Sequence, residues 1–197
     1  HPLKDIVLPP YKPDDFEDVP ATGKRMGERH IKHLRESGKW KEAVQACLAA
    51  DSFADACVGH VLDALEKSPY KDNTVIVLWG DHGWHLGEKQ RWRKFTLWEE
   101  ATRAPLIWYA PGVTKADTVC SRPVDFLSIY PTLCELAGID TPSHVEGRSI
   151  VPLLKDPQAK WDGVAITTNG FMNHSVRNEN WRYTRYRDGS EELYDHR

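Results

Sequence analysis

Cysteine and long apolar runs are scarce in this sequence, and their scarcity excludes several kinds of protein. Only four of the 197 residues are cysteines, and no two have the C-x-x-C spacing of a zinc or iron–sulfur motif. No apolar run approaches the roughly 20 residues that a membrane-spanning helix requires, and no signal-peptide pattern is visible. We therefore expect no membrane partner and no cysteine-bound metal.

An excess of basic charge is also missing. The formal net charge is −3, so the chain lacks the basic footprint that nucleic-acid-binding proteins carry. We expect no nucleic-acid partner. Tryptophan, by contrast, is plentiful at eight residues, and an aromatic core accounts for most of them better than a binding cleft does.

The spacing of the cysteines favours small buried side chains over disulfides. Cys47 and Cys57 fall on one expected helix, about 15 Å apart at 1.5 Å per residue, which is too far for a disulfide. The pairing of Cys120 and Cys134 stays open, and so does the redox compartment.

Composition divides the chain into three parts. Residues 1–40 are rich in proline and charge, so we expect an extended, irregular segment that packs on the main domain, with a short helix around residues 25–36. Residues 41–160 carry alternating helix and strand signals. Residues 161–197 are β-prone. We predict an α/β domain followed by a small antiparallel β subdomain.

The main domain begins with the strongest periodic signal in the chain. Between residues 41 and 68, apolar residues recur at the i, i+3, i+4, i+7 spacing of one buried helical stripe. Pro69 ends this helix, and the unbroken apolar run of residues 75–79 predicts a strand buried on both faces. A second strand is expected at residues 105–110. A helix that leads directly into a strand implies a parallel-type sheet with flanking helices.

Turn and cap residues define the later helices. Asp125 is expected to cap a helix that ends at Gly138 and is kinked or restarted at Pro131. Ser149 is expected to cap a short helix at residues 150–155.

The tail changes character and predicts a small antiparallel sheet. Asp188-Gly189 is a hairpin-turn signal between two of its strands. The expected strands lie at residues 164–168, 175–177, 181–186 and 191–195.

Asp81 and His82 stand just after the first strand, where ligands collect in open α/β sheets. A carboxylate beside an imidazole can supply part of a metal site. Gly80 and Gly83 permit the turn that would aim both side chains at one ion. Lys94 adds a compact positive charge for an anionic ester oxygen, so together these residues suggest hydrolysis of an anionic ester. The alternative is that Asp81 caps the following turn and His82 hydrogen-bonds a backbone carbonyl.

Three neighbouring residues are weaker candidates. His85 could contact substrate, although a solvated loop histidine explains it as well. Glu88 fits a supporting or salt-bridging group better than a metal ligand. Trp84 belongs to a group of tryptophans near the motif that could stack on sugar rings.

The stretch GDHGWHLGEKQRWRK followed by ATRAPLIWYAPG resembles the C-terminal half of type I, formylglycine-dependent sulfatases of the alkaline-phosphatase superfamily. Iduronate-2-sulfatase-like members are the nearest group. The similarity continues through VDFLSIYPTLCELAGI, EGRSIVPLL and WRYTRYRDGSEELYDH, so it covers nearly the whole chain. It implies part of an alkaline-phosphatase-like α/β sandwich and its terminal antiparallel sheet.

The resemblance assigns roles to the motif. Asp81 and His82 resemble the two calcium ligands that the second half of such a protein contributes to a single ion. Lys94 resembles the catalytic lysine that contacts the sulfate group. His85 and Trp84 are given only a possible substrate role.

The formylglycine of such enzymes is made from the Cys or Ser of a C/S-x-P-x-R segment, and this chain departs from that pattern. The segment Cys120-Ser121-Arg122-Pro123-Val124-Asp125 fails it from either starting residue. The paired N-terminal aspartates of the metal site are absent as well. The resemblance therefore implies a C-terminal portion, inactive alone, whose partners are the N-terminal portion of the same enzyme and a sulfated small molecule or sugar.

Two competing functions stay open. A related phosphodiesterase or phosphonate monoester hydrolase carries a similar DHG loop. A non-catalytic carbohydrate-binding module could keep the same fold. The resemblance favours an exported protein over a cytoplasmic one.

Overall fold

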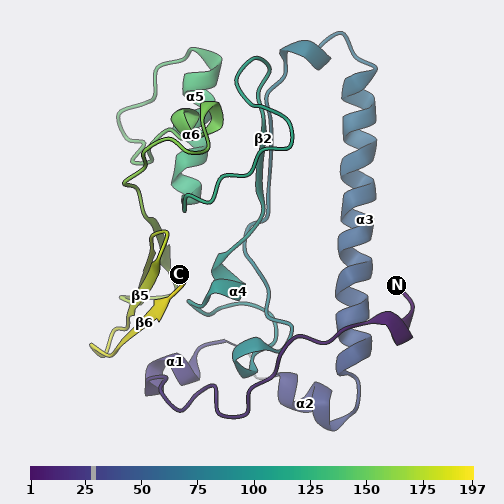
Figure 1. Cartoon of the computed structure of the whole chain (residues 1–197), viewed down its shortest axis with the longest axis vertical. Helices are drawn as coiled ribbons and strands as arrows, with labels where there is room; N and C mark the ends of the chain where they lie inside the picture. Colours follow the sequence, from purple (N-terminus) through teal and green to yellow (C-terminus); the bar gives the residue numbers. More distant parts are fainter. Residues whose placement is uncertain (28–29) are drawn as a thin grey trace. The chain divides into compact units, whose positions relative to one another are not determined.

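The computed structural model describes residues 1–27 and 30–197 and divides into two compact units (Figure 1). Unit 1 comprises residues 1–72 and 81–104, and unit 2 comprises residues 73–80 and 105–197. In the described part of the chain, no helix is long and apolar enough to cross a membrane. The predicted division into residues 1–40, 41–160 and 161–197 stays a prediction.

Unit 1 is helical and is dominated by one long helix, which Figure 1 labels α3. The predicted helix over residues 41–68 is confirmed as α3, Trp40–Glu66. The short helix that we expected near residues 25–36 is α2, which begins later, at His30. Residues 28 and 29, which the prediction included, lie outside the described residues. The elements of unit 1 are η1 (Leu3–Asp5), α1 (Ala21–Arg25), α2 (His30–Glu36), α3, η3 (Glu88–Gln90) and α4 (Glu99–Thr102), with η2 (Lys71–Asn73) at its border.

The core of unit 1 forms around the first turns of α3. Val44 of α3 packs with Ile6, Ile31 and Trp92, and the partly buried Trp40 and Leu48 lie against them. Farther along the helix Phe53 and Val61 are 74% and 69% exposed. The prediction of one continuous buried stripe is therefore wrong beyond the first turns of α3. Apolar periodicity identifies the face of a helix that can be buried, but burial also requires another element that packs against that face.

The cysteines are less buried than predicted. All four are free; Cys134 is buried and Cys47 is intermediate, whereas Cys57 and Cys120 are exposed. The prediction of small buried side chains is wrong for the exposed pair. Burial also raises the pKa of the Cys47 thiol, and the Asp51 carboxylate adds to that effect.

Unit 2 begins with two strands, β1 (Ile76–Trp79) and β2 (Leu106–Tyr109), which confirm the two predicted apolar strands. They pair antiparallel, with Ile76 opposite Tyr109, so the parallel pairing is wrong. The Gly80 amide donates to the Pro105 carbonyl at 3.1 Å, so β2 begins beside the end of β1 and runs back alongside it.

The strands of this pair are also less buried than predicted. Trp79 is 47% exposed, and Ile107 on the partner strand is 58% exposed. A run of apolar residues indicates that both faces can be buried, but the described part of unit 2 does not cover them.

The helices of unit 2 follow the predicted turn chemistry in part. The chain restarts at Ser128, between η4 (Phe126–Ser128) and α5 (Ile129–Ala137), so Pro131 lies in the first turn of α5. Gly138 ends α5 in the left-handed region at φ 67°, as predicted. Asp125 occupies the N-cap position of η4, as predicted, but its side chain makes no capping bond. The N-cap of α6 (Val151–Lys155) is Ile150 and not Ser149, although the Ser149 hydroxyl accepts a bond from the Val151 amide at 3.2 Å.

The predicted terminal sheet is confirmed as four antiparallel strands in the order β3-β4-β5-β6. Asp188-Gly189 forms the predicted hairpin, with Gly189 at φ 82°. A buried carboxylate, Glu192, accepts bonds from the Tyr186 and Tyr194 hydroxyls at 2.7 and 2.6 Å. The strands are β3 (Ala165–Thr168), β4 (His174–Arg177), β5 (Trp181–Arg185) and β6 (Glu191–Asp195).

Candidate functional site

Three of the predicted site residues converge on one atom of unit 1, the Nε2 of His82. The Asp81 carboxylate oxygen Oδ2 lies 3.3 Å from this nitrogen, and the Lys94 Nζ lies 2.6 Å from it. Residues 13 positions apart in the chain therefore meet, because the loop between them folds back on itself. The sequence-based grouping of Asp81, His82 and Lys94 agrees with this geometry.

The tautomer of His82 follows from its other nitrogen. Nδ1 lies 2.8 Å from the Gly83 carbonyl oxygen, which can only accept, so Nδ1 carries the proton and donates it. Nε2 is then left with a lone pair, and the Lys94 ammonium donates to it. The predicted alternative, in which His82 bonds a backbone carbonyl, is thus realised at Nδ1 and leaves Nε2 able to act as a ligand.

The geometry of this pair suits one edge of a hard-cation site. Calcium takes ligands at about 2.3–2.6 Å, and two ligands at a right angle are then about 3.3–3.7 Å apart. The Asp81 oxygen and the His82 nitrogen are 3.3 Å apart, and the Asp81 side chain is 84% exposed, so further ligands could reach the same point. No group of three or more His, Cys, Asp or Glu side chains that could hold a metal occurs among the described residues. The pair alone does not make up a metal site, and calcium binding stays a prediction.

Gly83 fixes the start of the loop by close approach to α4. Its amide donates to the Ala101 carbonyl at 2.9 Å. A Cβ placed on Gly83 would clash with the backbone carbonyl oxygens of Glu100 and Arg103. We expected Gly83 to permit an unusual turn; instead, its φ is not positive, and the missing side chain makes room for the end of α4.

His85 is fully buried, so its interpretation as a solvated loop histidine is wrong. Its Nε2 lies 2.8 Å from the Thr96 hydroxyl, and its ring meets the Trp98 ring edge to face, with centroids 6.1 Å apart. Burial lowers the pKa of His85 to about 4. Its possible substrate role stays a prediction, which this position does not support.

Long-range contacts hold the middle of the loop. The Trp40 indole donates to the Leu86 carbonyl at 2.6 Å, and Gly87 lies directly against the same indole, where a side chain would clash. Glu88 accepts a bond from the Leu86 amide at 2.8 Å, which agrees with its supporting role. Lys89 forms an ion pair with Asp15 at 3.0 Å, with both side chains mostly buried.

Arg91 is a further structural residue of the loop, and the sequence analysis missed it. Its guanidinium donates to the carbonyls of Lys24, in the last turn of α1, and Met26, just after that helix. It also lies over the Phe16 ring, 4.5 Å from the centroid. Its partners are more than 60 residues away in the chain, so no local signal marks it.

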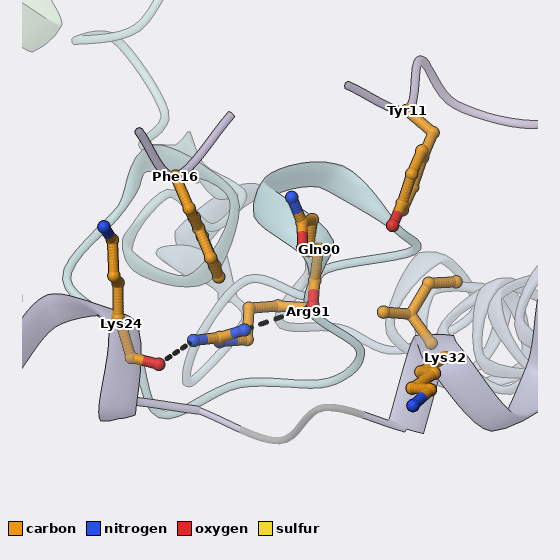
Figure 2. A pocket seen from close by; sticks show the side chains of 7 residues that line it. Tyr11, Phe16, Lys24, Lys32, Gln90 and Arg91 are labelled. Carbon is orange, nitrogen blue, oxygen red and sulfur yellow. Dashed lines mark hydrogen bonds between the residues drawn. The ribbon is translucent and has the colours of Figure 1, made fainter. Parts of the chain in front are cut away.

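Arg91 lies at the wall of a hollow of about 390 Å³ within unit 1 (Figure 2). Phe16 and Tyr11 lie on either side of Arg91 in Figure 2. The Gln90 side-chain amide donates to the Pro13 carbonyl at 2.8 Å. Because the polar groups of Arg91 and Gln90 are bonded to backbone carbonyls, these side chains anchor residues 12–26 to the loop.

Trp84 is a partly accessible aromatic ring beside the pair. It is 38% exposed and stacks on the His82 ring at a centroid distance of 6.2 Å. The Arg93 guanidinium lies 5.9 Å from its centroid. Its substrate role stays a prediction.

Sequence comparisons identify the family of the chain. The profile of the protein family described as Sulfatase matches residues 1–139. The chain belongs to the sulfatase family. A sulfatase from Formosa agariphila is 45% identical over 199 residues, which cover 99% of this chain.

The predicted sequence similarity to iduronate-2-sulfatase-like members is distant. Mouse iduronate 2-sulfatase is 34% identical over 122 residues, or 50% of this chain and 22% of that protein. Among solved structures, BT4656 in complex with D-glucosamine-2-N,6-O-disulfate matches 81% of this chain and 35% of its own with a TM-score of 0.74 and 28% identity. The predicted alkaline-phosphatase-like α/β class is confirmed at this level.

The chain spans only part of its sulfatase relatives. It covers 39% of the length of the Formosa protein. Any role of Asp81, His82 and Lys94 in a whole sulfatase therefore stays a prediction.

Proposed function

We propose that this chain supplies one side of the active site of an enzyme that hydrolyses sulfate esters of carbohydrates. The observation that carries the proposal is the convergence of Asp81 and Lys94 on the His82 Nε2, in a chain of the sulfatase family. A carboxylate and an ammonium that each lie close to one imidazole nitrogen suit a cation beside an anionic ester.

Each side chain has a distinct role in this proposal. Asp81 and His82 hold one calcium ion, together with ligands from another segment of the enzyme. When bound, the calcium supplies positive charge that stabilises the developing charge of the ester oxygens. Lys94 donates to a sulfate oxygen. Its present acceptor, the lone pair of His82 Nε2, is also the predicted ligand atom, so Lys94 and a cation are alternative partners of that nitrogen.

The nucleophile belongs to another segment. The 197-residue sequence contains no C/S-x-P-x-R segment. The exposed Cys120 has its Sγ 3.5 Å from the Pro157 carbonyl oxygen. We infer that formylglycine comes from the N-terminal portion of the same enzyme and that this chain alone does not turn over substrate.

The substrate class rests on the relatives and on the aromatic surroundings. Iduronate 2-sulfatase is named for a sulfated sugar, and BT4656 was solved with a disulfated glucosamine. The accessible ring of Trp84 beside His82 offers a face on which a sugar ring can stack.

The test uses the full encoded enzyme and an aryl sulfate, with calcium added or removed by a chelator. Asp81→Asn and Lys94→Met are expected to lower kcat/KM by about 100-fold or more, because the first weakens the proposed calcium site and the second removes a positive charge near the developing anion. Asp51→Asn and Lys67→Met change the same residue types at exposed positions on and just after α3 and should retain activity.

Two outcomes would contradict the proposal. Turnover by the 197-residue chain alone, abolished by Asp81→Ala, would place the nucleophile within it. Sugar binding that persists without turnover in the full enzyme would favour the non-catalytic carbohydrate module.

A further inference from the structure

Lys94 lies in a strained segment of backbone. Its two neighbours, Arg93 and Phe95, have φ angles of 74° and 70°, in the left-handed region that non-glycine residues rarely adopt. Each such residue costs on the order of 1 kcal/mol or more and persists only where surrounding contacts hold it. The direction of the Lys94 side chain therefore depends on whatever holds residues 93–96.

His85 contacts this segment on both sides of Lys94. Its backbone exchanges two hydrogen bonds with Arg93, His85 N to Arg93 O at 2.8 Å and Arg93 N to His85 O at 3.0 Å. Its imidazole Nε2 lies 2.8 Å from the Thr96 hydroxyl. One residue thus holds the segment before and after the lysine.

The burial of His85 makes this side-chain contact specific. The imidazole is 0% exposed, and among the described residues its Nδ1 has no partner within hydrogen-bond geometry; the Glu100 carboxylate lies 3.9 Å away. A buried ring nitrogen is unfavourable unless it is bonded, and an aliphatic side chain could fill the same space. The imidazole Nε2 is bonded to Thr96 at 2.8 Å, a contact that only a polar side chain of this reach can form.

We propose that His85 is a positioning residue that holds Lys94 opposite His82 through its bond to Thr96. This inference rests on the proposed function, in which Lys94 contacts the sulfate. It replaces the substrate contact that the sequence suggested for His85.

Separate supports for the two halves of the site make the inference testable. Asp81 and His82 adjoin Gly83, which is bonded to α4 through Ala101. Lys94 adjoins the residues that His85 holds. Loss of the His85–Thr96 bond should therefore displace Lys94 and leave the two predicted calcium ligands in place.

The test compares Thr96→Val with Thr96→Ser in the full encoded enzyme, with Thr118→Val as an exposed control. Thr96→Val keeps the shape but removes the hydroxyl and should lower kcat by about 10- to 100-fold, because small displacements of catalytic groups have effects of this size. Thr96→Ser restores the hydroxyl and should stay within about threefold of wild type. KM from steady-state kinetics should change by less than about threefold in both variants. The calcium Kd, measured by titration calorimetry, should not rise by more than about threefold, because Lys94 competes with the ion for His82 Nε2.

A second pair tests the imidazole itself. His85→Gln places an amide near the position of Nε2 and should preserve much of the activity, whereas the shorter His85→Asn does not reach Thr96 and should not. Circular dichroism melts give the folded fraction, to which each kcat is normalised. Equal kcat in Thr96→Val and wild type would overturn the inference, and so would a parallel loss of calcium affinity.

A spectroscopic readout separates this inference from the proposed function. In the calcium-free protein, the ¹⁵N resonance of His82 Nε2 reports the hydrogen bond from Lys94. We expect it to shift in Thr96→Val and to stay in Thr96→Ser. If the wild-type enzyme shows no aryl-sulfate turnover, the proposed function fails, while an unchanged resonance in Thr96→Val would still overturn the positioning role.

Discussion

At the scale of single residues, His85 shows how burial changes the chemistry of a side chain. Its pKa falls from 6.5 to about 4 chiefly because burial disfavours the charged ring; the Glu88 carbonyl opposes this shift, and the charges of Arg91 and Lys89 add to it. Burial likewise raises the pKa of the facing Glu100. His85 is therefore neutral in the folded protein at neutral pH.

This lowered pKa predicts a pH-dependent stability. The unfolded chain takes up a proton at His85 near pH 6.5, whereas the folded chain does so only near pH 4, so the unfolded state binds more protons in between and stability falls as pH falls. Between pH 7 and pH 5 the loss should be about 2 kcal/mol. Urea unfolding of wild type and His85→Gln at both pH values measures it. Equal losses in the two proteins would assign the effect to other groups.

Gly83 predicts a second effect at this scale. Gly83→Ala introduces a Cβ that clashes with the Glu100 and Arg103 carbonyls, so the loop must shift, at about 1–3 kcal/mol of stability. The shift should also displace His82 and weaken calcium binding. Gly59→Ala is the matched control, since its Cβ meets nothing within 4 Å in the exposed part of α3, and it should stabilise the helix by about 0.5–1 kcal/mol. Thermal melts and calcium titration of both variants measure the difference.

At the scale of elements, the sequence predicted the existence of helices and strands better than their environment. The apolar rhythm of α3 and the runs of β1 and β2 are local properties, and each element forms where expected. The antiparallel pairing of β1 with β2 depends on a contact between Gly80 and Pro105, which local patterns do not report. The predicted burial of Val61 is wrong for a similar reason, because a side chain is buried only where another element packs against it.

The terminal sheet predicts a contrast between two tyrosines. Tyr186 and Tyr183 each donate to a glutamate, at 2.7 and 2.6 Å, but Tyr186 is 2% exposed whereas Tyr183 is 38% exposed. Tyr186→Phe leaves the buried Glu192 with one fewer donor and should cost about 1–3 kcal/mol. Tyr183→Phe should cause no measurable loss, because water replaces the missing hydroxyl. Chemical denaturation compares them, and similar losses would contradict the role of burial.

At the scale of the whole molecule, the candidate site was predictable where its residues are close in sequence. Asp81, His82 and Lys94 lie in one stretch, and their convergence agrees with the prediction. Their supports come from distant residues: Trp40 bonds Leu86, and further contacts tie the loop to Asp15 and Met26. Such supports have no local signature, so Arg91 and the burial of His85 were missed.

The exposed apolar faces predict how the chain behaves apart from the rest of the enzyme. Phe53 and Val61 on α3 are 74% and 69% exposed, and we propose that the N-terminal portion of the enzyme covers them. The 197-residue chain should then bind a hydrophobic dye such as ANS, and Phe53→Lys with Val61→Lys should reduce that binding, because less apolar surface is left in water.

The same double substitution in the full enzyme separates a covered face from a solvated one. If the face is covered, two buried and unpaired lysines should lower the stability of the enzyme by several kcal/mol. Val119→Lys, at a residue 85% exposed outside the helices and strands, is the control and should leave it unchanged. An enzyme that tolerates both lysines on α3 as well as it tolerates Val119→Lys would show that this face stays in water, and the N-terminal portion would then have to join the chain elsewhere.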